Sequence, residues 1–227
     1  MIQKIFTRMM MVMLLMVASQ SVSAQERRPI DSQHPLWLVH IDVWNSADPQ
    51  KIIDLIPDDI KPYVCMNLSL SCQYDTDTEM YRMPRYAVRT YKSWATVCQA
   101  NGMWFTCQPA SGGHTHIQDD DLATFEYFFK TYPNFLGCNY SEQFWGFDVA
   151  GNKSSSTPAN RWALFAKLVE MSHQYGGFLT VSWCGGTYHM NTNPIAELKR
   201  DKNFLAACQK YPEAILFLYK YTHAGCF

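Results

Sequence analysis

Six short apolar runs separated by amphipathic stretches constrain the fold of this chain more than any other feature of its sequence. The runs are residues 36–42, 63–70, 103–111, 135–142, 177–186 and 214–222. Most of them are continuously apolar rather than alternating in polarity, which is typical of strands that are buried on both faces. The sequence therefore predicts a central sheet whose two faces are both covered.

Amphipathic segments with helix start and stop signals lie between the apolar runs. They comprise a short helix within 48–60 and longer helices over 84–102, 119–133, 157–177 and 193–212. Proline stands at the start of two of them, at Pro158 and Pro194, and glycine follows the ends of two, at Gly102 and Gly176. The strand and helix alternation predicts an α/β protein with a parallel sheet, either a (β/α)8 TIM barrel or a doubly wound sheet.

Polar and aromatic residues gather at the end of nearly every predicted strand. They are His40, Asp42, Trp44, Asn45, Asn67, Gln108, Ser111, His114, Glu142, Gln143, Trp145 and Trp183. Barrel enzymes build their sites at the carboxyl ends of several strands, and no GxGxxG or phosphate loop follows the first strand here. We therefore expect the TIM barrel. Because a complete barrel has eight strands, we expect residues 25–227 to be the N-terminal part of a barrel that is truncated after the sixth.

Residues 1–24 have the pattern of a secretory signal peptide. Lys4 and Arg8 precede the apolar stretch MMMVMLLMVA, which is too short to span a bilayer, and SVSA supplies small residues before the cleavage point. We expect cleavage after Ala24 and a secreted, periplasmic or cell-surface protein without a membrane span after cleavage. An uncleaved anchor is the alternative.

The composition of the chain indicates which classes of partner and cofactor to expect. The formal net charge of −1 does not favour nucleic acid or an anionic membrane. Aromatic residues form 15% of the chain, which suits a large aromatic core or rings that stack on a ligand. No Cys or His cluster has metal-ligand spacing, so we expect no metal and no cofactor. The oligomeric state stays open.

Few or no disulfides are expected among the eight cysteines. Four of them lie within or at the end of apolar runs and two lie in helical patterns, where a cysteine usually behaves as a small buried hydrophobic residue. These six are Cys65, Cys107, Cys138, Cys184, Cys98 and Cys208.

Glu142 is the leading candidate for catalysis, because it ends the fourth strand among Tyr140, Phe144, Trp145 and Phe147. A carboxylic acid beside rings and out of water has a raised pKa, since desolvation disfavours the anion. It can then act as a general acid that protonates a departing sugar oxygen. The alternative is a glutamate that only hydrogen-bonds a ligand or forms an ion pair.

A second carboxylate is normally needed for glycoside hydrolysis, and Asp42 is the other acid at a strand end. It is either a base or, as we favour, a residue that orients His40 or a sugar hydroxyl. His114 lies in the glycine-bearing loop 109–116 and could bind a ligand. Trp183 is either a sugar platform or a packing residue.

Five segments that carry these residues resemble the catalytic module of glycoside hydrolase family 98. They cover residues 34–71, 94–113, 132–148, 175–185 and 193–204, and they include the motif NYSEQFWG around Glu142. The resemblance implies a secreted, endo-acting enzyme with a (β/α)8 barrel that hydrolyses its substrate with inversion. The family includes endo-β-1,4-galactosidases that release blood-group oligosaccharides from host glycans, and also endo-xylanases.

The resemblance also implies roles for individual residues. Glu142 matches the family's general acid, and the family's base falls beyond Phe227 in our alignment. The residues that would line the cleft and bind the sugar are His40, Asp42, Trp44, Asn67, His114, Tyr140, Trp145 and Trp183. The leading hypothesis is an endo-glycosidase acting on blood-group-type glycans or a related polysaccharide. An endo-xylanase, a catalytically inactive truncated fragment that binds glycan, and an unrelated barrel lyase or isomerase are the alternatives.

Overall fold

A parallel sheet of six strands forms the centre of the computed structural model, which describes residues 27, 31–43, 48–69, 73–75, 80–82, 87–108, 119–141, 158–184 and 202–220. The strands are β1 (Trp37–Asp42), β2 (Val64–Ser69), β5 (Trp104–Gln108), β6 (Phe135–Ser141), β7 (Leu179–Cys184) and β8 (Ile215–Lys220). Every neighbouring pair is parallel and the strands lie side by side in chain order. This sequential order is that of a barrel, whereas a doubly wound sheet reverses its order at a switch point. The predicted α/β fold of barrel type is confirmed.

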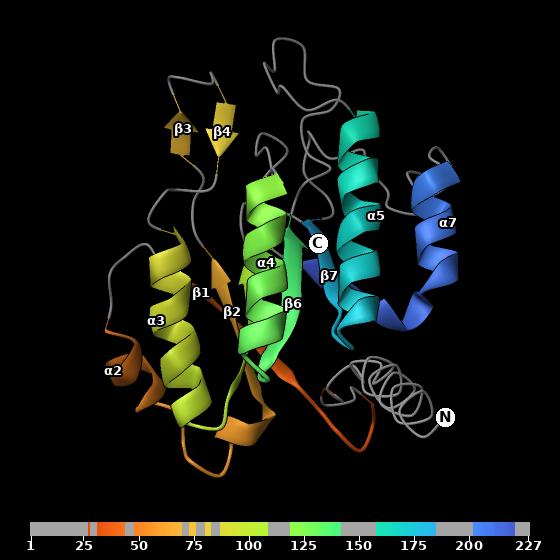
Figure 1. Ribbon diagram of the computed structural model, residues 1–227. Helices are drawn as coiled ribbons and strands as arrows, with labels where there is room; N and C mark the ends of the chain where they lie inside the picture. Colours follow the sequence, from red (N-terminus) through yellow and green to blue (C-terminus); the bar gives the residue numbers. More distant parts are fainter. Residues whose placement is uncertain are drawn as a thin grey trace, which may run out of the picture.

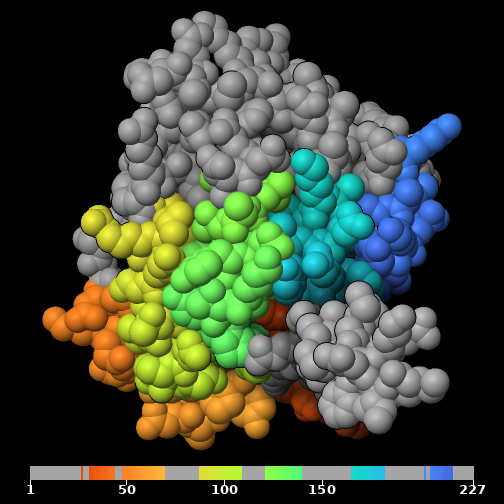
Figure 2. Space-filling model, in the orientation of Figure 1, coloured from red at the N-terminus to blue at the C-terminus, as the bar shows by residue number. Residues whose placement is uncertain are grey.

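Helices follow the strands and cover one face of the sheet. They are α2 (Pro49–Ile53), α3 (Ala87–Ala100), α4 (Asp119–Thr131), α5 (Pro158–Gln174) and α7 (Lys202–Lys210), with 3-10 turns at Lys61–Tyr63 and Pro212–Ala214. Figure 1 shows α3, α4, α5 and α7 on the same side of the strands, and Figure 2 shows them side by side across that face. Asp48 begins α2 by accepting a hydrogen bond from the main-chain nitrogen of Gln50.

A short antiparallel hairpin, absent from the predicted elements, follows the second strand. Its strands are β3 (Gln73–Asp75) and β4 (Met80–Arg82), and Figure 1 shows it beyond the carboxyl end of β2. Each strand has three residues, which is too short for a polarity pattern to be recognised.

The outward face of the sheet and the helices share the main hydrophobic core. Phe105 of β5 packs there with Tyr91 and Trp94 of α3 and with Phe125 and Phe128 of α4, all buried. The ring of Phe105 meets that of Phe128 edge to face, an arrangement that aromatic pairs prefer. These contacts explain part of the high aromatic content as core packing.

The inward face divides into an apolar and a polar half. Near the amino ends of the strands, Cys65, Leu136 and Phe178 are buried together, and Leu36, Leu38, Trp104 and Leu216 pack against them. Two residues further along β2 and β5, the side chains become polar, at Asn67 and Thr106. The carboxyl half of the interior is therefore built for hydrogen bonding.

A bulge in β6 changes which residues of that strand face the interior. The pairing of β5 with β6 shifts register between Phe105 and Thr106, which pair with Phe135 and Gly137. Simple alternation from Phe135 would direct residue 139 outward. The extra residue reverses the alternation, and Asn139 instead reaches an interior hydrogen bond with Gln108.

The cysteines that the structure describes with their side chains are free thiols. They are Cys65, Cys98, Cys107, Cys138 and Cys208, and all but Cys208 are buried. The expectation of small buried hydrophobic residues is confirmed for the four buried thiols, and Cys208 packs against the main core while partly exposed. No helix within the described ranges has the length and hydrophobicity of a membrane span.

Candidate functional site

Four buried polar side chains, which we call the polar network, lie in the carboxyl half of the sheet interior. They are Asn67 of β2, Thr106 and Gln108 of β5, and Asn139 of β6, and each is at most 4% exposed. Parallel pairing places Asn67 beside Thr106. Buried polar groups are stable only where they are hydrogen-bonded, and these four satisfy one another.

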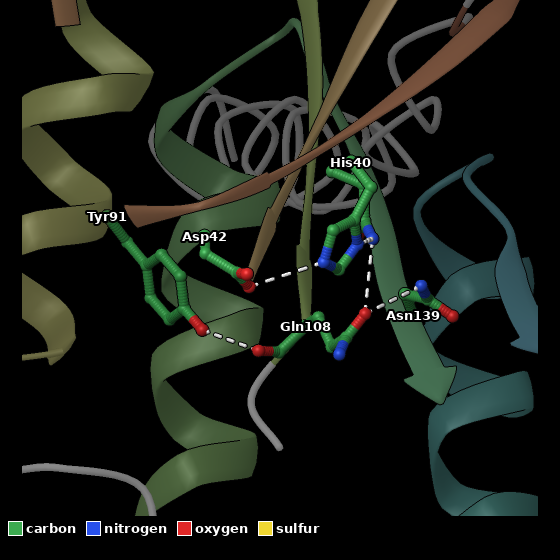
Figure 3. Close-up of polar contacts among 6 residues, drawn as sticks. His40, Asp42, Tyr91, Gln108 and Asn139 are labelled. Carbon is green, nitrogen blue, oxygen red and sulfur yellow. Dashed lines mark hydrogen bonds and ion pairs between the residues drawn. The ribbon is translucent and has the colours of Figure 1, made fainter. Parts of the chain in front are cut away.

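Gln108 is the centre of the polar network. Its Oε1 accepts a hydrogen bond from Nδ2 of Asn67 at 3.2 Å and another from Nδ2 of Asn139 at 3.0 Å. The hydroxyl of Thr106 donates to Oδ1 of Asn67 at 3.0 Å. Figure 3 shows the side chain of Gln108 joined to that of Asn139 by a dashed line. The polar network thus links three adjacent strands through side chains as well as through the sheet.

His40 and Asp42 of β1 form an exposed pair that contacts the buried polar network through Asn67. Nδ1 of His40 lies 3.0 Å from Nδ2 of Asn67, and Nε2 of His40 lies 3.3 Å from Oδ1 of Asp42. The side chain of His40 is 45% exposed and that of Asp42 is 50% exposed. The polar network therefore has a buried floor and a solvent-accessible end that carries an imidazole and a carboxylate (Figure 3).

Tyr91 of α3 fixes the end of β5 from behind. Its hydroxyl donates to the main-chain oxygen of Gln108 at 2.8 Å, and the side chain is fully buried. Burial raises the pKa of Tyr91 well above its ordinary value, so the phenol stays protonated and remains a donor. The last residue of β5 is therefore held by its main chain as well as by its side chain.

The structure brings together three of the predicted site residues, His40, Asp42 and Asn67. Tyr140 and Trp183 are the next-to-last residues of β6 and β7, where the structure describes the main chain. The other four, Trp44, His114, Glu142 and Trp145, lie outside the described residues. In the sequence, Glu142 comes directly after Ser141, the last residue of β6.

Thr106, Asn139 and Tyr91 were not singled out from the sequence. The signal for Thr106 and Asn139 is a polar residue inside an otherwise apolar run, as in WFTCQ and LGCNYS. The bulge at Gly137 hides the role of Asn139, because regular alternation predicts the opposite face. Tyr91 has no distinguishing signal, since its ring is ordinary helix core and only its hydroxyl reaches the strand.

The exposed end of the polar network carries two groups that could contact a ligand, His40 and Asp42. Within the part of the chain that the structure describes, no group of three or more His, Cys, Asp or Glu residues could hold a metal ion. The groups at the exposed end, an imidazole and a carboxylate, suit hydrogen bonding to a polyhydroxylated ligand.

Six parallel strands in chain order, with polar side chains in the carboxyl halves of β1, β2, β5 and β6, define an α/β barrel module of the kind found in enzymes. The model of Glycosyl hydrolase family 98 matches residues 24–227. The chain therefore belongs to this family of glycoside hydrolases. The comparison with curated proteins gives no match.

Solved structures confirm the fold. The catalytic module of a family 98 glycoside hydrolase from Streptococcus pneumoniae TIGR4, in its native form, is 17% identical with a TM-score of 0.59. The same module in complex with the H-disaccharide blood group antigen is 17% identical, and in complex with the LewisY pentasaccharide antigen 16% identical, both with a TM-score of 0.59. Each match covers 86% of this chain and 33% of the other, so the chain spans a third of those modules.

Proposed function

We propose that this chain contributes six strands to the barrel of an exported glycoside hydrolase that cleaves β-1,4 linkages within blood-group-type glycans, with inversion. The observation that carries the proposal is the exposed His40 and Asp42 pair, which is held by a buried polar network at the carboxyl ends of the strands. Membership of family 98 supplies the reaction class. The blood-group antigens bound by the similar Streptococcus pneumoniae module support the substrate class.

The described residues would serve sugar binding. A carboxylate accepts hydrogen bonds from sugar hydroxyls and an imidazole donates or accepts one, and both groups of the pair are accessible. We place Asp42 in this binding role, because its Oδ1 already accepts a hydrogen bond from His40. Asn67 supports the pair from below. We propose that Trp44, His114, Tyr140, Trp145 and Trp183 complete the sugar cleft.

Glu142 would supply the proton in the reaction. In inverting hydrolysis one carboxylic acid protonates the leaving oxygen while a second carboxylate activates water on the opposite face of the sugar. Glu142 stands three residues after Asn139, which the polar network holds, so the main chain that leads to Glu142 is anchored. We assign the base to another carboxylate of the complete enzyme and not to Asp42.

Product analysis tests this function. The full-length protein is incubated with blood-group oligosaccharides and, separately, with β-1,4-xylan, and the products are measured by mass spectrometry and by NMR of the newly formed anomeric centre. We expect internal cleavage of the blood-group glycan and an α-anomer as the first product. Cleavage of xylan alone would identify an endo-xylanase. Binding without cleavage in a glycan array would identify a glycan-binding protein.

Export is tested separately. N-terminal sequencing of the protein recovered outside the cytoplasm should begin at Gln25, the residue after the proposed cleavage point. A protein that starts at Met1 and stays with the membrane fraction would instead favour the uncleaved anchor.

A further inference from the structure

We propose that Asn67 is a positioning residue that holds neutral His40 in the tautomer with its proton on Nε2. The tautomer itself follows from the hydrogen bonds of the polar network. Its effect on the reaction rests on the proposed function, because His40 and Asp42 are placed there in sugar binding.

Two buried partners, Gln108 and Thr106, fit the Asn67 amide in one orientation. Oε1 of Gln108 can only accept, so it requires the Nδ2 side of Asn67, and the Thr106 hydroxyl, which can donate or accept, then donates to the Oδ1 side. The Thr106 hydroxyl is completely buried and lies 3.0 Å from Oδ1 of Asn67. With Oδ1 on that side, the Nδ2 group of Asn67 points toward His40 and Gln108. Both of its hydrogens are then engaged, one toward Nδ1 of His40 at 3.0 Å and one toward Oε1 of Gln108 at 3.2 Å.

The Asn67 amide determines the protonation of His40. An amide NH₂ group can only donate, so the ring nitrogen that faces it must accept and cannot carry a hydrogen. Neutral His40 therefore has its proton on Nε2, which faces Oδ1 of Asp42 at 3.3 Å. Each donor along this path meets an acceptor, from Thr106 through Asn67 and His40 to Asp42.

Turning the amides over gives a second hydrogen-bond arrangement, in which the His40 ring carries a different charge. If Asn67, Gln108 and Asn139 were all turned over, the contacts of Gln108 would each keep one donor and one acceptor. Oδ1 of Asn67 would then require a hydrogen on Nδ1 of His40. Nε2 would then need its own hydrogen to face the Asp42 carboxylate, so His40 would have to be an imidazolium. Among the described residues Asp42 is the charged group that contacts His40. The two arrangements thus predict different protonation states of the His40 ring.

Two other histidines of the same protein provide an internal contrast. Nδ1 of His34 lies 2.8 Å from Oδ1 of Asp31, and Nδ1 of His173 lies 2.6 Å from Oε1 of Glu213. A carboxylate only accepts, so these two rings carry a hydrogen on Nδ1. His40 is distinguished from them because its Nδ1 faces a donor.

The consequence for the site concerns Asp42. The hydrogen bond from Nε2 of His40 orients Oδ1 of the Asp42 carboxylate. The second carboxylate oxygen has no partner within the residues that the structure describes, and it is the atom we expect to accept a sugar hydroxyl. Asn67 therefore acts on sugar binding through His40 and not by touching the sugar.

NMR of the full chain labelled with ¹⁵N-histidine tests the proposal, because the two ring nitrogens give distinct shifts in each tautomer. His40→Gln identifies the His40 signals by their loss. We expect the wild type to show an unprotonated Nδ1 and a protonated Nε2 on His40 at neutral pH. We expect the opposite tautomer, with protonated Nδ1, for His34 and His173 when neutral. An imidazolium or a protonated Nδ1 on neutral His40 would overturn the proposal.

Two variants test whether Asn67 is the cause. Asn67→Asp replaces the donor by an acceptor of the same shape, so we expect Nδ1 of His40 to become protonated. Thr106→Val removes the buried donor to Oδ1 of Asn67 and weakens the preference for this orientation, so we expect the second tautomer to become partly populated. An unchanged His40 spectrum in a folded Asn67→Asp protein would refute the role of Asn67. An unchanged spectrum in a folded Thr106→Val protein would refute only the part of Thr106 in orienting the amide.

Kinetics separates this proposal from the proposed function. If the wild type cleaves glycan, Asn67→Asp should raise KM about tenfold, the scale of one weakened hydrogen bond, with little change in kcat. A lower kcat at unchanged KM would contradict the binding role. If the wild type cleaves nothing, the hydrolase proposal fails while the NMR result still decides the tautomer.

Discussion

The main-chain oxygen of Phe178 lies where a β-carbon on Gly137 would have to be. The φ angle of Gly137 is +140°, which side chains rarely tolerate. The main-chain nitrogen of Phe178 donates to the oxygen of Leu136 at 2.8 Å, so the two strand ends are joined at this point. Because Gly137 also forms the bulge that turns Asn139 inward, one glycine connects strand packing to the polar network.

Gly137→Ala should destabilise the fold strongly. The positive φ costs about 1–2 kcal/mol and the overlap with Phe178 adds about 1–3 kcal/mol, giving roughly 2–5 kcal/mol. The measurement is the free energy of unfolding from urea titration. Gly102→Ala is the matched control, because Gly102 has a φ of +67° but nothing within 4 Å of its added carbon. Equal losses for the two variants would show that the contact with Phe178 is unimportant.

Gln108→Met should destabilise the protein through its neighbours. The side chains of Asn67 and Asn139 both donate to Oε1 of Gln108, and each buried amide left without this acceptor costs about 1–3 kcal/mol. We therefore expect a loss of about 2–6 kcal/mol in the free energy of unfolding.

Thr180→Val provides the control for that variant. Thr180 is equally buried, but its hydroxyl donates at 3.3 Å to the main-chain oxygen of Cys138, so we expect a loss of about 0.5–1.5 kcal/mol. A Gln108→Met protein as stable as Thr180→Val would mean that the polar network contributes little to stability.

The sequence predicts the sheet well because strand burial leaves a direct pattern. The runs 63–70 and 135–142 correspond to β2 and β6 within one residue at each end, since a continuous apolar run of this length has few other interpretations. The β3 and β4 hairpin was missed, because three-residue strands carry no period. For the helix predicted over 193–212, the structure gives Lys202–Lys210, and residues 193–201 lie outside the described ranges.

The candidate site was predicted less completely than the fold. His40, Asp42 and Asn67 were found because polar residues at the ends of predicted parallel strands converge on one edge. Their mutual contacts depend on register and on amide orientation, which no local pattern encodes. Gln108 was noticed at a strand end, but its central place depends on Asn139, whose inward direction requires the bulge. The alternation of side chains along a strand cannot predict a feature that arises from one inserted residue.

Arg27 should anchor the start of the chain to the base of the sheet. Its buried guanidinium donates to the main-chain oxygens of Phe135 at 2.7 Å and of Phe129 at 2.6 Å, and also to that of Tyr175. Burial lowers the pKa of Arg27, but the group stays charged at neutral pH, and hydrogen bonds from charged donors are strong. We expect Arg27→Met to lower the free energy of unfolding by roughly 2–4 kcal/mol.

Arg89→Met is the control for this anchor. Arg89 is exposed on α3, and surface substitutions usually change stability by less than about 0.5 kcal/mol. Calorimetric melting of the two variants beside the wild type gives the comparison. If the Arg27→Met and Arg89→Met proteins have the same melting temperature, the contacts of Arg27 add nothing to stability.

The buried thiols should make the fold sensitive to high pH. Burial raises the pKa of Cys98 from 9.0 to about 12 and that of the half-buried Cys208 to about 11. The unfolded chain loses these protons first, so their contribution to stability is complete below pH 9.0 and declines as the pH rises from there toward the folded values. Urea titrations below and above pH 9.0 should show the decline.

Alkylation of the native protein at neutral pH checks the same thiols directly. Peptide mapping after brief treatment with iodoacetamide should find Cys208 labelled faster than Cys98, because only Cys208 is partly accessible. Both should be labelled after denaturation. Labelling of native Cys98 as fast as that of Cys208 would show that α3 does not protect its thiol.

The most direct test of the proposed reaction compares Glu142→Gln with the wild type on two substrates. One is the natural glycan, whose leaving oxygen needs a proton, and the other is a dinitrophenyl glycoside of the same sugar, whose leaving group does not. We expect kcat on the natural glycan to fall by about 10²–10⁴-fold and kcat on the activated glycoside to change far less. Equal losses on both substrates, or no loss on the glycan, would contradict the assignment of Glu142 as the proton donor.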